Sequence, residues 1–164
     1  MRVYGTILTF IWFLRKARFT KSKMVQFYCR IMLRHWRNKY GLEISPDTKI
    51  GKGLYLGHPY GITVNTDSII GNNCCLHKGD TIGQENRGER AGCPIIGNEV
   101  WIGVNATIVG KICIGDDVLI APNSFVNRDV PNHSVVYGNP CVIKHKDNAT
   151  EHYVRNTDYE IHIR

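Results

Sequence analysis

The first candidate for proton-transfer chemistry is the histidine at position 58. It lies in segment 56–62, Leu-Gly-His-Pro-Tyr-Gly-Ile, where two extra residues interrupt a six-residue pattern. Histidine has an unperturbed pKa near neutrality, so a neutral imidazole can accept a proton from a reacting group. The alternative is a histidine that points to solvent at a corner of the fold. Its place at the interruption favours a base.

A second cluster of candidates follows at His77, Lys78 and Asp80. One turn of about eighteen residues plus the two-residue interruption places Lys78 over His58. Asp80 stands at an inward position of the repeat, where a charge needs a partner or a functional reason. The cluster predicts contacts to an acceptor molecule, and the alternative is a solvated corner.

The cysteines form no recognisable metal or disulfide pattern. There are six, with no CxxC spacing, and Cys74 directly precedes Cys75. We interpret them as small apolar residues in a reducing cytosol. A cytoplasmic location and the absence of a bound metal are therefore expected.

The stretch that must position these candidates is a six-residue repeat. An aliphatic residue returns at every sixth position without a break: Ile96, Ile102, Ile108, Ile114, Ile120 and Val126. This period fits neither an amphipathic helix nor an alternating strand. It is typical of a parallel β-helix, so we expect a mainly β fold.

The same pattern predicts the division of the chain. The repeats begin at Ile44, slip after Leu56 and resume at Val64. The polar segment 84–95 interrupts them again, and we expect it to leave the coil as an external loop. The expected parts are a basic, apolar helical segment (1–41), a β-helix domain (42–146) and a tail lying on the body or partly disordered (147–164).

The N-terminal segment concentrates the positive charge. Residues 1–42 hold ten lysines and arginines and no acid, whereas the whole chain has a net charge of +7. Because this charge belongs to one segment, a nucleic-acid surface is a poor explanation. Residues 3–14 are nearly all apolar but too few to cross a bilayer, which needs about 20. They pack on a neighbouring subunit, or they anchor the protein at the inner face of the cell membrane through residues 1–40.

A second helix is expected over residues 21–40, with Gly41 as its C-cap. Two apolar stripes recur at three- and four-residue steps. They are Met24, Tyr28, Ile31, His35 and Val25, Tyr28, Met32, Trp36. We expect this surface to be core or subunit contact.

The coils, the external loop and the ending Asp129-Val130-Pro131 with Gly138-Asn139-Pro140 resemble the hexapeptide-repeat acyltransferases. The likeness covers residues 42–146 and is greatest to serine acetyltransferases and their sugar O-acetyltransferase relatives. It implies a left-handed coil of triangular section, a homotrimer with active sites between subunits, and acetyl-CoA as donor.

The resemblance also implies roles for particular residues. His58 matches the catalytic histidine, which takes the hydroxyl proton of the acceptor as its oxygen attacks the thioester. Glu43 aligns with the aspartate that orients this histidine, although a longer side chain replaces the family's residue. The pantetheine arm of the donor would lie against Gly83, Gly103, Ala106 and Ala121, and its phosphates would pair with Lys144 and Lys146.

Three departures from serine acetyltransferases predict a different acceptor. The acid before the catalytic histidine is replaced by Gly57, a second active-site histidine by Cys93, and the long helical N-terminal domain is missing. We therefore expect transfer to a hydroxyl of a saccharide in surface or capsular polysaccharide synthesis. Its expected contacts are Tyr60, His77, Lys78, Asp80 and Cys93.

Three alternatives stay open. One is a serine O-acetyltransferase of cysteine biosynthesis. Another is a hydratase of the γ-carbonic anhydrase type, whose metal needs three histidines including a pair five residues apart. The histidines within residues 42–146 are His58, His77, His133 and His145, and they offer no such pair. The last is a non-catalytic scaffold that binds a membrane or a partner through its helices.

Overall fold

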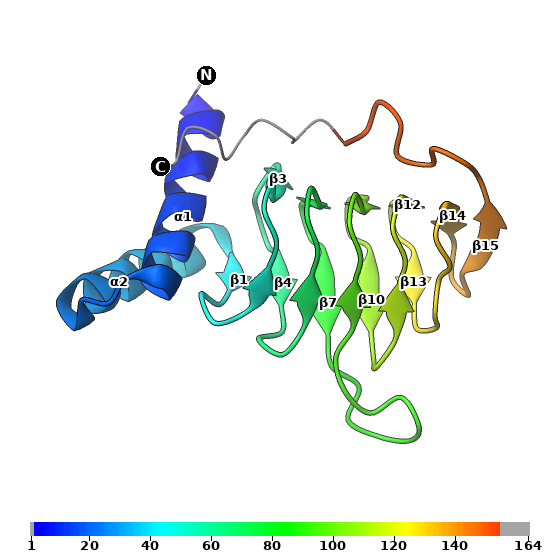
Figure 1. Cartoon of the computed structure of the whole chain (residues 1–164), viewed down its shortest axis with the longest axis horizontal. Coiled ribbons are helices and arrows are strands. Elements are labelled where there is room, and N and C mark those ends of the chain that lie inside the picture. Colours follow the sequence, from blue (N-terminus) through cyan, green and yellow to red (C-terminus); the bar gives the residue numbers. More distant parts are fainter. Residues whose placement is uncertain (1, 155–164) are drawn as a thin grey trace.

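A computed structural model of the chain describes residues 2–154, with side chains described from Ile7 onward. Two helices lead into a left-handed parallel β-helix of about five turns, which confirms the predicted fold class (Figure 1). The helices are α1 (Arg2–Phe19) and α2 (Lys23–Tyr40). The strands are β1 (Glu43–Ile44), β2 (Lys49–Ile50), β3 (Tyr55–Gly57), β4 (Thr63–Val64), β5 (Ile69–Ile70), β6 (Cys75–His77), β7 (Thr81–Gly83), β8 (Ile95–Ile96), β9 (Trp101–Ile102), β10 (Thr107–Val109), β11 (Cys113–Ile114), β12 (Val118–Ile120), β13 (Phe125–Val126), β14 (Ser134–Tyr137) and β15 (Val142–His145).

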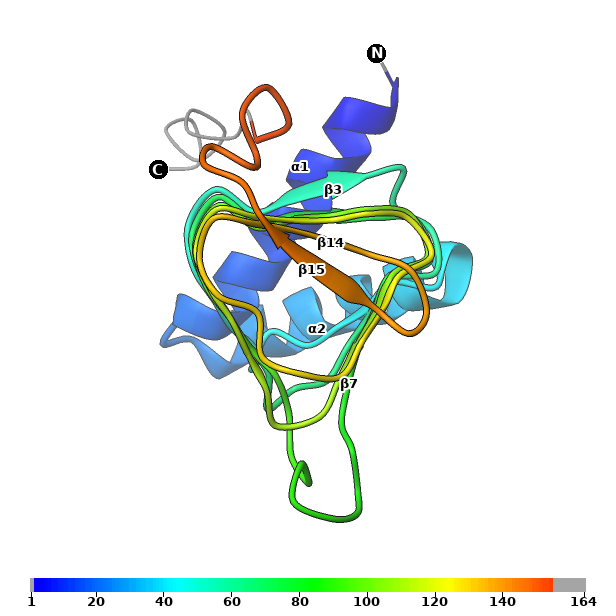
Figure 2. The same cartoon turned by 90° about the vertical axis from the view of Figure 1, so that its right-hand side faces the viewer.

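Three parallel sheets form the walls of a triangular coil (Figure 2). The first wall is β1-β4-β7-β10-β13, the second is β2-β5-β8-β11, and the third runs from β3 through β6, β9 and β12 to β14. Strand β15 then pairs antiparallel with β14 and closes that end of the coil. The external loop leaves between β7 and β8, where the first wall meets the second.

The inward aliphatic side chains of the repeat make the core. Leu56, Ile82, Ile102, Ile108 and Ile120 are fully buried. Each contributes roughly 1.5–3 kcal/mol through removal from water. The aliphatic residue of each repeat therefore points into the core of the coil, and three repeats, one for each wall, make one turn.

The two interruptions change the spacing without disturbing the pairing. Leu56 pairs with Leu76, twenty residues later, but Val64 pairs with Ile82 after eighteen. The extra residues bulge at the corner that carries His58. Ile82 pairs with Ile108, so the loop adds its length outside the walls.

The helices cover the first turn of the coil. Ser22 caps α2 through the Val25 N–H, and Gly41 ends it at φ 65° by donating to the Arg37 carbonyl at 2.8 Å. On α1, Phe10, Ile11 and Leu14 are buried in the core shared with α2 and the coil. The prediction that residues 3–14 present an apolar face to lipid or to another subunit is wrong for these side chains, because they lie in the chain's own core, where α1 packs on α2.

The two predicted stripes of α2 differ in burial. Val25, Met32 and Trp36 pack against the core, whereas Met24 and Ile31 point outward with exposed fractions of 84% and 49%. The sequence could not distinguish them, because both have helical spacing. Only one face of α2 lies against α1 and the coil.

The described part of the C-terminal tail lies on the coil. The Asp117 carboxylate accepts hydrogen bonds from the Ala149 and Thr150 N–H groups, both at 2.9 Å. It also accepts one from His133 Nδ1 at 2.8 Å. We name this four-residue cluster the tail clasp. The rest of the predicted tail lies outside the described residues.

Candidate functional site

His58 lies at the corner between β3 and β4, exposed and at φ 52°. The next turn of the coil runs beside it, since the Lys78 N–H donates to the Gly57 carbonyl at 3.1 Å. Lys78 is exposed at the equivalent corner. The predicted stacking of Lys78 over the His58 corner is therefore present.

Glu43 lies on the first turn, beside the strand that follows the His58 corner. It pairs with Thr63 on β4, and the Gly61 N–H donates to the Tyr40 carbonyl at 2.8 Å. The rings of Tyr40 and Tyr60 meet edge to face at 5.3 Å. Within the described residues, neither the Glu43 carboxylate nor the His58 ring makes a hydrogen bond or ion pair, so the predicted dyad stays a prediction.

His77 has a defined tautomer. Its Nδ1 lies 2.6 Å from the Ile102 carbonyl oxygen, which can only accept, so Nδ1 carries the proton and Nε2 is a hydrogen-bond acceptor. Burial lowers the pKa of His77, with a smaller contribution from His58. The neutral form of the His77 ring is therefore favoured near His58, and its Nε2 accepts no hydrogen bond from the residues that the structure describes.

Gly57 leaves the space that His77 occupies. A Cβ at position 57 would come within 2.2 Å of His77 Cδ2 and 2.5 Å of its Nε2. The missing acid before His58 therefore has a local cause, because the ring of the next turn already fills that position.

An aromatic wall continues from His77 along the coil. Its ring lies 4.8 Å from that of Trp101, and Trp101 meets Tyr153 of the tail at 5.0 Å. Sequence reasoning missed both residues. The outward position of Trp101 in its repeat was the available signal, whereas Tyr153 is brought there by the tail.

Asp80 does not touch solvent and cannot contact an acceptor, contrary to the prediction. Its exposed fraction is 0%, and it accepts from the His77 N–H at 2.6 Å and from the Ala106 N–H at 3.2 Å. Burial raises its pKa to about 8, against the effect of these two bonds. Asp80 therefore fixes the backbone that carries His77.

Cys93, another predicted acceptor contact, lies at a different corner of the coil. Cys93 ends the external loop, with its Sγ 4.0 Å from Gln84 Oε1, and Gln84 in turn bonds Asn65 at 3.4 Å. One chain alone does not bring Cys93 to His58. Tyr60, by contrast, is exposed at the His58 corner.

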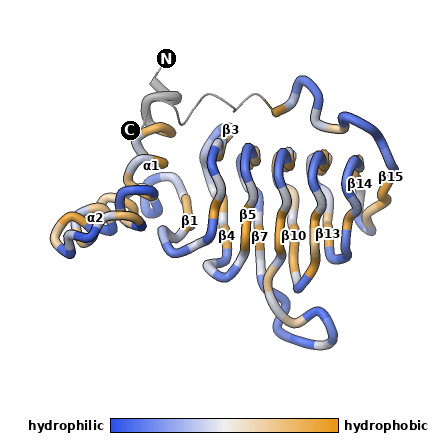
Figure 3. The backbone as a smooth tube through the Cα atoms, in the orientation of Figure 1, coloured by the Kyte–Doolittle hydropathy of each residue, from blue (hydrophilic) through white to orange (hydrophobic). Residues whose placement is uncertain are grey.

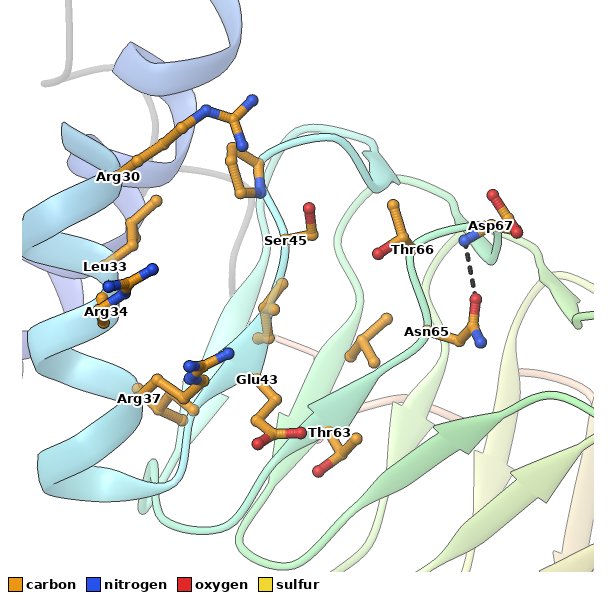
Figure 4. A pocket seen from close by; sticks show the side chains of 14 residues that line it. Arg30, Leu33, Arg34, Arg37, Glu43, Ser45, Thr63, Asn65, Thr66 and Asp67 are labelled. Atoms are coloured by element: carbon orange, nitrogen blue, oxygen red, sulfur yellow. Dashed lines mark hydrogen bonds between the residues drawn. The ribbon is translucent and has the colours of Figure 1, made fainter. Parts of the chain in front are cut away.

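A cavity of about 710 Å³ opens between α2 and the first two turns (Figure 4). Arg34 and Arg37 line one side and Glu43 the other, and Figure 4 shows the Arg37 guanidinium and the Glu43 carboxylate directed into it. The cavity therefore places cationic groups beside the residue predicted to orient His58.

The predicted donor contacts lie along the coil, but their N–H groups are engaged. Gly103 donates to Ile120, Ala106 to Gly103 and Ala121 to Val136. Their carbonyl oxygens already accept hydrogen bonds as well, at Gly103 and Ala106 from backbone N–H groups and at Ala121 from the Ser124 hydroxyl. Gly83 faces outward on β7, and Lys144 and Lys146 are exposed near the β15 end.

Neither a metal cluster nor a disulfide occurs among residues 7–154. No three histidine, cysteine or acidic side chains gather there as a metal site would require. All six cysteines are free, and burial raises the pKa of Cys74 to about 12.

Known proteins similar to this chain are serine acetyltransferases. A family model for bacterial transferase hexapeptide (six repeats) matches residues 93–128. The serine acetyltransferase of Helicobacter pylori is 32% identical over 133 residues, which cover 81% of this chain and 78% of that protein. Soybean serine acetyltransferase complexed with serine superposes with a TM-score of 0.68 at 30% identity, over 80% of this chain and 54% of that one. A serine acetyltransferase in complex with CoA gives 0.70 at 27%, over 82% and 55%. The chain thus spans about half the length of these solved relatives.

These similarities correct the predicted function. A saccharide acceptor and a role in polysaccharide synthesis are wrong, because the matching proteins are serine acetyltransferases. The helical domain that was expected to be missing is no argument against that family, since this chain covers 78% of the Helicobacter pylori protein. Nor does Gly57, whose space His77 fills. The chain belongs to the serine acetyltransferase family, acetyl-CoA-dependent enzymes among the hexapeptide-repeat acyltransferases.

Proposed function

We propose that this protein transfers the acetyl group of acetyl-CoA to the hydroxyl of serine. The observation that carries the proposal is the 32% identity to a serine acetyltransferase over 81% of the chain. The fold's likeness to a serine acetyltransferase complexed with serine supports the same acceptor.

In the proposed reaction His58 is the general base. Its imidazole takes the serine hydroxyl proton as the oxygen attacks the thioester carbonyl, which forms the new C–O bond. The tetrahedral intermediate then breaks its C–S bond, and the proton passes to the departing CoA sulfur. The products are O-acetylserine and CoA. Glu43 would hold His58 in the required tautomer.

The same corner offers groups for the two charges of serine. The neutral Nε2 of His77 can accept a hydrogen bond from the ammonium group, in the space where the family has an acid. The Lys78 ammonium, one turn beyond His58, can pair with the carboxylate. We further infer that the active unit is a homotrimer, in which a neighbouring subunit completes this exposed corner.

The test is serine-dependent release of CoA thiol from acetyl-CoA, with O-acetylserine identified by mass spectrometry. His58→Ala should lower kcat/KM by about 10²–10⁴-fold. His145→Ala, an equally exposed histidine on β15, should leave it unchanged. Purified wild-type protein that releases no thiol with serine would disprove the proposal, and an unaffected His58→Ala enzyme would disprove the mechanism.

A further inference from the structure

The two helices carry a second apolar surface that the chain itself does not cover. Its six large exposed side chains are Trp12, Phe19, Met24, Phe27, Tyr28 and Ile31, which we name the outer helical face. Phe19 and Phe27 are 70% and 68% exposed. These residues do not contribute to the core, so they need another reason to be apolar.

This face lies opposite the buried side of α2. Cys29 and Leu33 are buried against the core, whereas Phe27 and Ile31 project on the other side of the same turns. The hydropathy colouring shows apolar positions along α2 at the end of the molecule beyond the coil (Figure 3). The helix is therefore apolar on both of its sides.

The two helices that carry this face have no acidic residue. Arg15 and Arg18 of α1 bind carbonyl oxygens of the first turn, and Arg30 pairs with Asp47 at 3.0 Å. Four further exposed cations of the helices and their connection form no ion pair within the described residues and do not line the cavity beside Glu43. They are Lys16, Lys21, Lys23 and Lys39.

We propose that the outer helical face docks on the surface of an anionic lipid bilayer. Aromatic and aliphatic side chains would enter the headgroup boundary while the lysines and arginines meet lipid phosphates. A second copy of the chain is a poorer partner, because it would bring two cationic helices without acids together. Docking in the plane of the membrane also fits the length of the helices, none of which among the described residues is apolar enough to cross it.

The arrangement in the molecule makes such docking multivalent. Both helices lie at one end of the coil, away from β15 (Figure 1). In a trimer with parallel coils, which rests on the proposed function, three outer helical faces would meet one membrane. Linked weak contacts of this kind raise the apparent affinity well above that of one subunit.

The experiment is co-sedimentation of the full chain with two kinds of vesicle. One is pure phosphatidylcholine, and the other contains about one-third phosphatidylglycerol. The variants are Phe27→Ser/Ile31→Ser and Lys21→Glu/Lys23→Glu, with Val142→Ser as the matched control. Val142 is 44% exposed on β15, at the opposite end. Serine acetylation and circular dichroism of each variant show that it is folded.

Wild type and Val142→Ser should bind the anionic vesicles and release them at about 1 M salt. Lys21→Glu/Lys23→Glu should bind at least tenfold more weakly, since each basic residue near the surface contributes about fivefold, or about 1 kcal/mol. Phe27→Ser/Ile31→Ser should also bind at least tenfold more weakly, since two apolar side chains no longer enter the headgroup boundary. Equal binding to both vesicles, unchanged binding by the variants, or no binding at all would overturn the proposal. A higher oligomer that Phe27→Ser/Ile31→Ser dissociates, without vesicle binding, would assign the face to a second copy.

Discussion

Gly57 and His77 form one unit, although they belong to different turns. The backbone at position 57 lies against the imidazole, so a side chain there and the ring compete for one space. This contact is why a missing acid was misread as lost recognition of an amino acid. In the proposed function, His77, twenty positions along the chain, would supply the polar group instead.

This competition predicts the outcome of a double substitution. Gly57→Asp should displace His77 and lower kcat/KM for serine by about 10²-fold, of the order expected for a misplaced active-site group. Gly57→Asp/His77→Ala should recover part of that loss, because the carboxylate then has room and can bind the serine ammonium. Steady-state kinetics of the two variants decides this, and a double variant no better than Gly57→Asp contradicts it.

Asp80 predicts a dependence of stability on pH. The pKa of Asp80 in the folded chain is about 8, above the ordinary value of about 3.9. Its contribution to the free energy of unfolding is therefore greatest below pH 4 and is lost as the pH rises through 8. Asp80→Val should remove this loss and gain stability over wild type at pH 8.5. Urea denaturation at pH 5, 7 and 8.5 measures it, with the exposed Asp67→Asn as control. A constant difference between wild type and Asp80→Val would contradict the buried neutral carboxyl.

The tail clasp connects the C-terminal tail to the aromatic wall. Asp117 holds the tail, the tail brings Tyr153 onto Trp101, and Trp101 lies against His77. Hydrogen bonds from His133 and the tail lower the pKa of Asp117, although burial opposes them, and Asp117 raises the pKa of His133. The ionic part of the clasp is therefore lost as pH falls through the low Asp117 value, and as it rises through the His133 value above 6.5.

Hydrogen exchange can test the clasp. Protection of the Ala149 and Thr150 amides should fall in wild type between pH 6 and pH 9. In Asp117→Asn it should be low at both pH values, with a loss of about 2 kcal/mol from bonds to a charged acceptor. Asp116→Asn, on the exposed neighbour, is the control. Undiminished protection in Asp117→Asn would mean that other contacts hold the tail.

The helical cap has its own prediction. Phe10 is 1% exposed and packs near Trp36, with ring centroids 6.3 Å apart. Phe10→Ala should lower the free energy of unfolding by about 3–5 kcal/mol. Phe27→Ala, on the outer helical face, should change it by less than about 0.5 kcal/mol. Urea denaturation distinguishes the two, and equal effects would contradict the assignment of inner and outer faces.

The sequence predicts the structure where the pattern is local, and it fails where a residue's partner lies far along the chain. The stretch from Ile96 to Val126 predicts the coil because an aliphatic residue returns at every sixth position. The faces of α2 could not be separated, since both Val25 and Met24 keep helical spacing and only the coil decides between them. The contacts of Asp80 and His77 could not be predicted for the same reason, although both residues were candidates. Their partners, Ala106 and Ile102, lie one turn away.

At the scale of the whole molecule, the proposed trimer is open to direct measurement. Sedimentation equilibrium should give three times the chain mass of 18.7 kDa. The reason is that the His58 corner is exposed in one chain and needs a neighbour to exclude water from the reaction. A monomer with full serine acetylation would show instead that one coil suffices.

The two ends of the coil prevent end-to-end stacking of one molecule on the next. Every turn presents an edge on which another turn could add, and a bare edge would accept the next molecule's turn as readily as its own. Arg15 occupies carbonyl groups of the first edge, and β15 runs against the direction of β14 at the last. Both features act as terminators. A chain stripped of α1 and α2, or of β15, would be expected to stack end to end into filaments, so the ends keep a repetitive polymer-forming unit as a discrete enzyme.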